Sequence, residues 1–194
     1  MGQRLIRIAA AVLAFCAGAG AAGAQGPKPT ALLLDGLFIY VQQNYIGVSV
    51  LAANVERLGY RVVVDNHLMS RTAGVEPDVI IGHSMGGSTA LRYAAERIAA
   101  GKPAPLVITI DAAFGSGACP ATRCINIHTP GFPQIIGAEN IDAWQSGAFM
   151  VNHAMLATNE TVQRMVMDRL AELLAARQAP TPPLTAPVPV PRPR

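Results

Sequence analysis

The sequence predicts an α/β fold in which helices cover both faces of a mostly parallel β-sheet. Short apolar runs alternate with segments of helical periodicity along the chain, which is the pattern of repeated strand–helix units. Most of these runs are near-continuous Val, Ile and Leu, as expected of strands that are buried on both faces. A chain of 194 residues can bury a sizeable core within one domain.

Five strands and three helices follow from these patterns. The strands are expected at residues 30–34, 59–65, 79–81, 106–110 and 124–128. The helices are expected at residues 46–58, 88–98 and from Thr158 or Asn159 to Arg177, with Gly59 closing the first of them. Residues 129–152 have no regular pattern and are predicted to be irregular. The connection between the fourth and fifth strands is predicted to be a loop without a clear helix.

The two ends of the chain are predicted to lie outside the folded domain. Residues 1–24 combine basic Arg4 and Arg7 with an apolar run and end in Ala22-Gly23-Ala24, which predicts a signal peptide cleaved after Ala24. We therefore expect a secreted or periplasmic protein with no membrane span after cleavage. An uncleaved anchor is the alternative, and a lipoprotein signal is disfavoured because Phe15 is too large for the position before Cys16. Residues 25–178 form the predicted domain, and residues 179–194 form a Pro-rich tail.

Charge and cysteine content narrow the classes of partner. Residues 25–178 hold 11 Lys and Arg against 12 Asp and Glu, so the domain is close to neutral and no nucleic-acid partner is expected. Once the signal peptide has left, Cys119 and Cys124 remain as an even pair. An oxidising compartment would allow them to form a disulfide, and without a neighbouring His/Cys cluster they predict no metal site.

A candidate nucleophile stands out between the third predicted strand and the helix after it. The pattern Gly82-x-Ser84-x-Gly86 is that of a nucleophile elbow, in which a sharp turn presents a serine hydroxyl clear of the backbone. A side chain at Gly82 or Gly86 is expected to clash where strand and helix approach each other. The first turn of the helix would direct backbone N–H groups and its positive dipole end toward the hydroxyl.

The string Gly-His-Ser-Met-Gly-Gly resembles the elbow of α/β-hydrolases, especially lipases, esterases and type I thioesterases. The resemblance covers residues 30–177 and implies a minimal α/β-hydrolase fold without an obvious lid, acting on an ester without a cofactor. An open cleft is then expected beside the serine, flanked by five apolar side chains: Leu37, Phe38, Tyr40, Phe114 and Phe132.

The resemblance also implies a general base. Because the histidine comes last in the hydrolase chain order, His153 is the predicted base of Ser84, with His128 as the alternative. His83 directly precedes the serine, and its side chain is expected to point away from the hydroxyl.

An acid and an oxyanion hole complete the expected site. Asp111, which ends the strand after the elbow strand, is the predicted acid, with Asp142 and Glu139 as alternatives. The backbone N–H groups of Met85 and Leu37 are the predicted oxyanion donors, and Phe38 is the alternative to Leu37.

These residues predict an exported serine hydrolase that cleaves a carboxylic ester or thioester, whether of a small molecule or of a lipid, through an acyl-enzyme on Ser84. A thioesterase or acyltransferase is an alternative within the same chemistry. A non-catalytic, hydrolase-like binding module of the cell envelope is an alternative from another class. The oligomeric state has no signature in the sequence.

Overall fold

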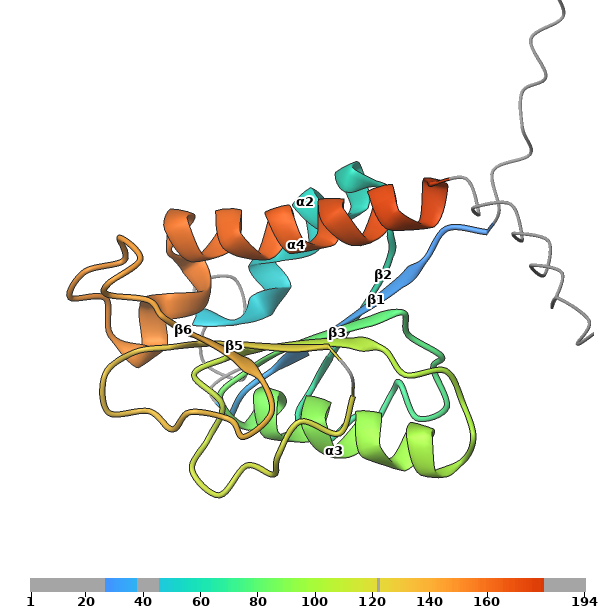
Figure 1. Cartoon of the computed structure of the whole chain (residues 1–194), viewed down its shortest axis with the longest axis horizontal. Helices are drawn as coiled ribbons and strands as arrows, with labels where there is room; N and C mark the ends of the chain where they lie inside the picture. Colours follow the sequence, from blue (N-terminus) through green and yellow to red (C-terminus); the bar gives the residue numbers. More distant parts are fainter. Residues whose placement is uncertain (1–26, 38–45, 122, 180–194) are drawn as a thin grey trace, which may run out of the picture.

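The structure is a computed structural model that describes residues 27–37, 46–121 and 123–179 (Figure 1). The predicted signal peptide, most of the predicted tail, and Phe38 and Tyr40 lie outside the described residues. Among the helices that are described, none is long and apolar enough to cross a membrane.

Six parallel strands form one sheet in the order β2-β1-β3-β4-β5-β6. In chain order, the elements are β1 (Thr30–Asp35), η1 (Val48–Leu51), α2 (Ala52–Leu58), β2 (Arg61–Asn66), β3 (Val79–His83), α3 (Met85–Ala99), β4 (Leu106–Ile110), β5 (Cys124–His128), β6 (Glu139–Asp142), η2 (His153–Thr158) and α4 (Glu160–Gln178). The predicted α/β class, with its parallel sheet, is confirmed, and no lid is evident among the described segments.

Helices cover both faces of this sheet. In Figure 1, α2 and α4 lie together above the sheet, and α3 lies below it. The neighbouring strands β1 and β3 lead to opposite sides of the sheet, to β2 and to β4. Because crossovers between parallel strands are right-handed, this reversal places the two connecting helices on opposite faces.

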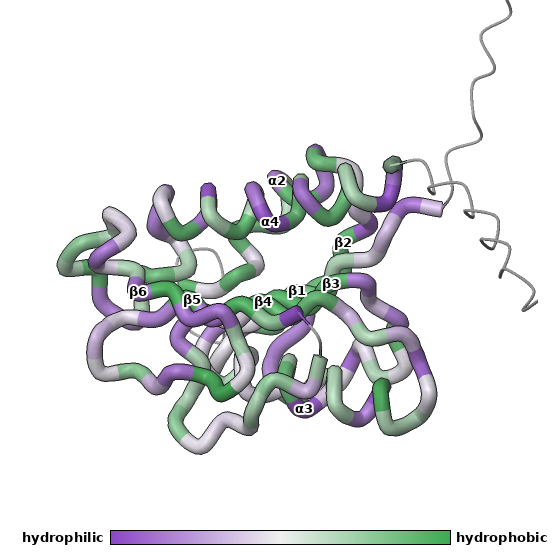
Figure 2. The backbone as a smooth tube through the Cα atoms, in the orientation of Figure 1, coloured by the Kyte–Doolittle hydropathy of each residue, from purple (hydrophilic) through white to green (hydrophobic). Residues whose placement is uncertain are grey.

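Alternating strand residues supply two apolar layers. Ala31 and Leu33 of β1 pack with α2 and α4, whereas Leu32 and Leu34 pack with α3. Figure 2 shows the central strands as a hydrophobic layer between helices of mixed polarity. A strand with large apolar side chains toward both faces fits only a two-sided sheet.

Helix ends follow the expected cap chemistry. Gly59 ends α2 in the left-handed conformation, at φ 119°. Asn159 begins α4, where its side chain accepts hydrogen bonds from the N–H groups of Thr161 and Val162. The predicted helix at 46–58 is only partly correct, because its first turn is the 3-10 helix η1.

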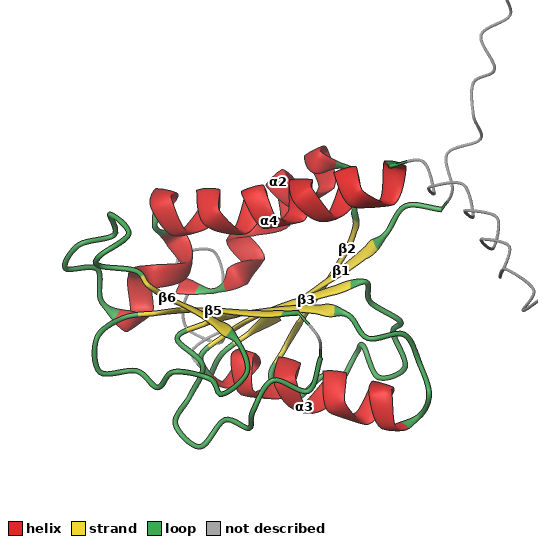
Figure 3. Ribbon diagram, in the orientation of Figure 1, coloured by secondary structure: helices red, strands yellow, loops and turns green. Residues whose placement is uncertain are grey.

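The prediction of an irregular segment at 129–152 is wrong at one place, where β6 adds an edge strand. The sequence of this strand, Glu-Asn-Ile-Asp, holds one large apolar residue and is partly exposed. Edge strands commonly carry polar side chains, so the apolar pattern of the inner strands is missing here. The loop predicted between β4 and β5 is present, as Figure 3 shows.

Candidate functional site

The site lies at the carboxyl ends of β1, β3 and β4, next to the point where the strand order reverses. In open α/β sheets, such a switch point is where connections diverge and leave a crevice. Ser84 occupies the turn between β3 and α3, with φ 56° and ψ −124°. This conformation is strained for a non-glycine residue and marks the turn as one that the surrounding structure enforces.

Two glycines make the turn possible. A Cβ at Gly86 would overlap the backbone of Leu34 in β1, and a Cβ at Gly82 would overlap the backbone of Gly86. The clash predicted for these positions is therefore confirmed. The close approach holds the first turn of α3 against β1 and fixes the direction in which Ser84 leaves the sheet.

The structure brings Ser84, His153 and Asp111 into one hydrogen-bonded chain. Nε2 of His153 lies 3.1 Å from Oγ of Ser84, and Nδ1 of His153 lies 3.2 Å from Oδ2 of Asp111. A carboxylate only accepts hydrogen bonds, so Nδ1 carries the proton and Nε2 can accept from the serine hydroxyl. This is the geometry of a general base that is oriented by an acid.

Asp111 is held in place by a residue that the sequence analysis missed. The Asp111 carboxylate is buried and accepts hydrogen bonds from Thr129, one from the backbone N–H at 2.7 Å and others from Oγ1. Asp111 itself has a φ of 44°, so two of the three aligned residues lie in the left-handed region. Thr129 directly follows β5, the neighbour of β4 in a parallel sheet. This position at the same end of the sheet as Asp111 is the signal that could have identified it.

The alternative bases and acids are engaged elsewhere. His128 directs Nδ1 toward the backbone oxygen of Thr129. Asp142 accepts from the N–H groups of Trp144 and Gln145. Glu139 pairs with Arg169 of α4 at 2.5 Å. Among the described residues, only His153 bridges the candidate serine to a carboxylate.

The loop after β1 closes against the nucleophile. A Cβ on Gly36 would lie 2.9 Å from Cβ and 3.4 Å from Oγ of Ser84, so the backbone leading into Leu37 passes directly beside the serine. Met85 is the first residue of α3, and its N–H has no acceptor within the helix. Both predicted donors therefore belong to segments that border Ser84.

His83 has a contact that the sequence did not reveal. Its Nε2 lies 2.9 Å from the backbone oxygen of His153, and the two rings are 4.7 Å apart. A carbonyl oxygen only accepts, so Nε2 of His83 carries a proton and donates it. Burial, and then the neighbouring His153, lower the pKa of His83 from 6.5 to about 4. The ring of His153 also stacks on that of Phe132, with the centroids 4.3 Å apart and the planes at 7°.

Exposed apolar side chains lie on the segments that adjoin the serine. Phe114 is 72% exposed and lies 5.4 Å from the ring of Phe132, while Leu37, Met85 and Met155 are also exposed. A hollow of about 380 Å³ opens between the first turns of α3 and the loop after β4, with Met85 and Phe114 among its lining residues. Of the five side chains predicted to flank a cleft, Phe132 stacks on His153, Phe114 lies beside Phe132, and Leu37 follows Gly36.

Cys119 and Cys124 form the predicted disulfide, with their Cα atoms 6.0 Å apart. This bond joins the loop after β4 to the first residue of β5. It shortens the free part of the segment that carries Phe114, and it leaves neither thiol available as a metal ligand.

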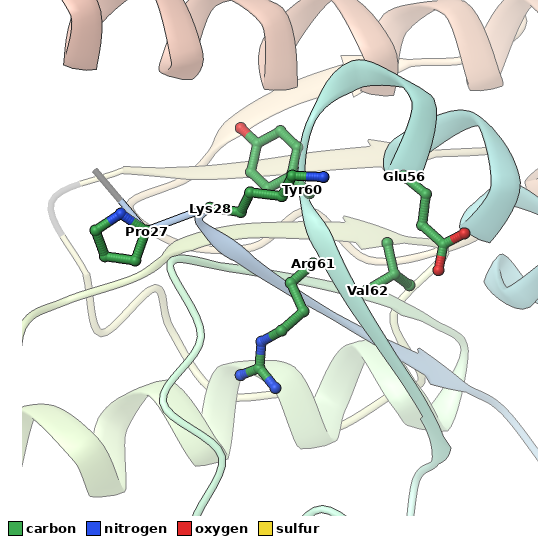
Figure 4. Close-up of a pocket in the computed structure, with 6 residues that line it drawn as sticks. All are labelled: Pro27, Lys28, Glu56, Tyr60, Arg61 and Val62. Atoms are coloured by element: carbon green, nitrogen blue, oxygen red, sulfur yellow. The ribbon is translucent and has the colours of Figure 1, made fainter. Parts of the chain in front are cut away.

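A second hollow lies at the opposite end of the sheet, where the strands begin. Figure 4 shows this pocket of about 500 Å³, where Lys28 and Arg61 lie at the amino ends of β1 and β2 and Glu56 lies on α2. Tyr60 lines the same hollow and donates its hydroxyl to the backbone oxygen of Leu170. Burial raises the pKa of Tyr60 to about 12, so this phenol is no candidate base.

Comparisons with protein-family models, with curated proteins and with solved structures found no match to this chain.

Proposed function

We propose that this protein is an exported serine hydrolase that cleaves a carboxylic ester or thioester. The observation that carries the proposal is the hydrogen-bonded chain from Ser84 through His153 to Asp111. The strained φ of Ser84 and the resemblance of its turn to the α/β-hydrolase elbow support the same conclusion. The disulfide is compatible with export.

In the proposed reaction, Oγ of Ser84 attacks the acyl carbonyl while Nε2 of His153 takes its proton. Asp111 keeps the imidazole oriented and stabilises its cation. The N–H groups of Met85 and Leu37 bind the oxyanion, each contributing about 3 kcal/mol. Collapse breaks the bond to the leaving alcohol or thiol, which receives the proton from Nε2. Water, activated in turn by His153, then attacks the acyl-enzyme and releases the acid and free Ser84.

The surroundings of the serine favour an ester with an apolar acyl group. The segments beside Ser84 carry exposed apolar side chains, Leu37 after Gly36 and Met85 at the start of α3, and Met85 shares a hollow with Phe114. Apolar contact of this kind contributes roughly 25 cal/mol for each Å² removed from water. No cofactor takes part in the proposed steps.

A fluorophosphonate probe tests this proposal directly. We expect the wild type to be labelled and Ser84→Ala to remain unlabelled and to lose hydrolysis of p-nitrophenyl esters. Ser88→Ala is the matched control, because Ser88 lies one turn further along α3 and pairs with Ser116 instead of a histidine. Labelling that persists in Ser84→Ala, or an inactive wild type across esters of graded chain length, would overturn the proposal.

The same assay separates the alternatives. A thioesterase would prefer an acyl thioester over its oxygen ester, and an acyltransferase would form a new ester when an alcohol is added. The non-catalytic binding module predicts no labelling at all. The 3.1 Å approach of His153 to Ser84 supports the catalytic proposals over that one.

A further inference from the structure

We propose that His83 is a positioning residue for His153: its ring N–H holds the backbone carbonyl of the base and so ties the base to the strand that carries the nucleophile. The inference rests on the proposed function and adds a role to a residue that touches no substrate. His83 is the last residue of β3 and precedes Ser84 directly. One residue thus links the two reacting side chains through the backbone.

The geometry of His83 fits this role. Its Nε2 lies 2.9 Å from the backbone carbonyl oxygen of His153. Only 3% of His83 is exposed, so water does not compete for this donor. Its ring also lies 4.7 Å from the imidazole of His153, which itself stacks on Phe132. Two rings therefore contact the imidazole of the base.

His153 needs such support more than its partners do. Ser84 and Asp111 follow β3 and β4 directly, whereas His153 begins a 3-10 helix after a connection from the edge strand β6. That connection contains Met150 in the left-handed region. Side-chain hydrogen bonds within it include those that Asp142 accepts from Trp144 and Gln145, the indole of Trp144 on the oxygen of Val151, and the cap that Asn152 provides for η2.

A neutral ring suits the position beside the base. His153 becomes a cation during each proposed acyl transfer, and a second cation 4.7 Å away would oppose that step. Burial and His153 keep the pKa of His83 low, while Asp111 is the acidic group that faces it. The ring therefore donates its N–H without adding charge.

Two variants of similar length test the role. Glutamine places an amide N–H where Nε2 stands, whereas methionine fills the same space without a donor. We expect His83→Met to lower kcat about tenfold, the loss of one hydrogen bond, with KM changed less than twofold. We expect His83→Gln to retain most of the wild-type kcat. His83→Asn carries the same amide on a shorter stem and should behave like His83→Met.

A double variant distinguishes a positioning role of His83 toward His153 from a general distortion of the site. In a His153→Ala background, His83→Met should leave the residual hydrolysis of an activated ester unchanged, because the group it positions is gone. The proposal is overturned when His83→Met and His83→Gln have equal kcat, or when His83→Met lowers the residual activity as much as it lowers that of wild type. Thermal unfolding of each variant reports its folding, and His83→Asn replaces any methionine variant that does not fold. If Ser84→Ala stays active, the proposed function has failed instead.

Discussion

The strands begin at one edge of the sheet, the amino edge, and end at the other, the carboxyl edge. These two edges are built differently, although both have hollows and polar groups. The amino edge has two hollows of about 500 and 530 Å³, each larger than the hollow of about 380 Å³ beside α3. Its turns into β2, β3 and β4 use glycine where φ is positive: Gly59, Gly74 and Gly101. At the carboxyl edge, glycines with positive φ also follow strands, at Gly115, Gly131 and Gly147, but the four described non-glycine residues with positive φ all lie there too: Met69, Ser84, Asp111 and Met150.

This difference shows where the fold keeps strain. A glycine in the left-handed region gives a turn at little energetic expense, whereas an L-residue there costs roughly 1–2 kcal/mol. Two of the strained positions carry the candidate nucleophile and acid. Strained backbone and aligned proton carriers, rather than the size of a hollow, therefore distinguish the candidate site.

The largest expected effect concerns the acid at the carboxyl edge. Asp111→Asn should lower kcat about 10⁴-fold, because the amide no longer fixes the tautomer of His153. Asp142→Asn is the control: Asp142 ends β6 at the same edge, and its carboxylate accepts from backbone N–H groups of a turn instead of from a histidine ring. Steady-state hydrolysis of a p-nitrophenyl ester measures both. Equal activity of the two variants would mean that Asp111 is not the acid.

Two glycine substitutions, one at each edge of the sheet, are compared by the free energy of unfolding that each one costs. Gly86→Ala should lower the free energy of unfolding by about 4 kcal/mol or abolish folding, since its Cβ would overlap the backbone of β1. Gly101→Ala, at φ 71° with open space around it, should lower it by about 1 kcal/mol. Urea unfolding followed by circular dichroism measures the difference, and similar losses in both would contradict the asymmetry.

Much of the fold was predictable because the inner strands must be apolar on both faces. Ser84 was found because its turn demands glycines at two fixed positions. Asp111 followed from its place at a strand end, and His153 from the chain order of the resembling family. The signals for Ser84 and Asp111 are local or come from a strand end, whereas that for His153 comes from the resemblance alone.

The remaining features depend on contacts between distant segments. β6 is an edge strand whose polar residues break the apolar pattern. The carbonyl contact of His83 depends on where η2 lies, which no local pattern encodes. Thr129 could be placed at the correct edge, but its hydrogen bonds to Asp111 require the register of β4 with β5.

Lowering the pH should lower the free energy of unfolding through the protonation of His83. Unfolded His83 binds a proton below pH 6.5, whereas the folded ring stays neutral down to about 4. The unfolded state then binds more protons in this window, so stability falls as pH drops, by about 3 kcal/mol between pH 6.5 and 4. His83→Gln should flatten this slope in urea titrations at several pH values. Because burial raises the pKa of Asp35 and gives it the opposite sign, the difference between variant and wild type is the quantity to compare. An unchanged slope would show that His83 titrates normally.

Phe114 offers a smaller test of the apolar surroundings. Phe114→Ala should lower kcat/KM for an octanoate ester about tenfold and leave the acetate ester nearly unchanged, because only the long chain reaches the ring. Ile136→Ala is the control, since Ile136 is also largely exposed, at 81% against 72%, but lies beside the disulfide loop. Equal losses for both esters would place Phe114 outside the acyl path.

The smallest expected effect is that of a substitution at the amino edge. Tyr60→Phe removes the hydrogen bond to the oxygen of Leu170 and should lower the free energy of unfolding by about 1 kcal/mol. The ring still fills the space between β2 and α4, so kcat and KM should not change. Thermal unfolding and ester hydrolysis, measured on the same preparation, give both values. A change in kcat here would mean that the two edges are coupled through α4, whose first residues follow the helix that begins at His153.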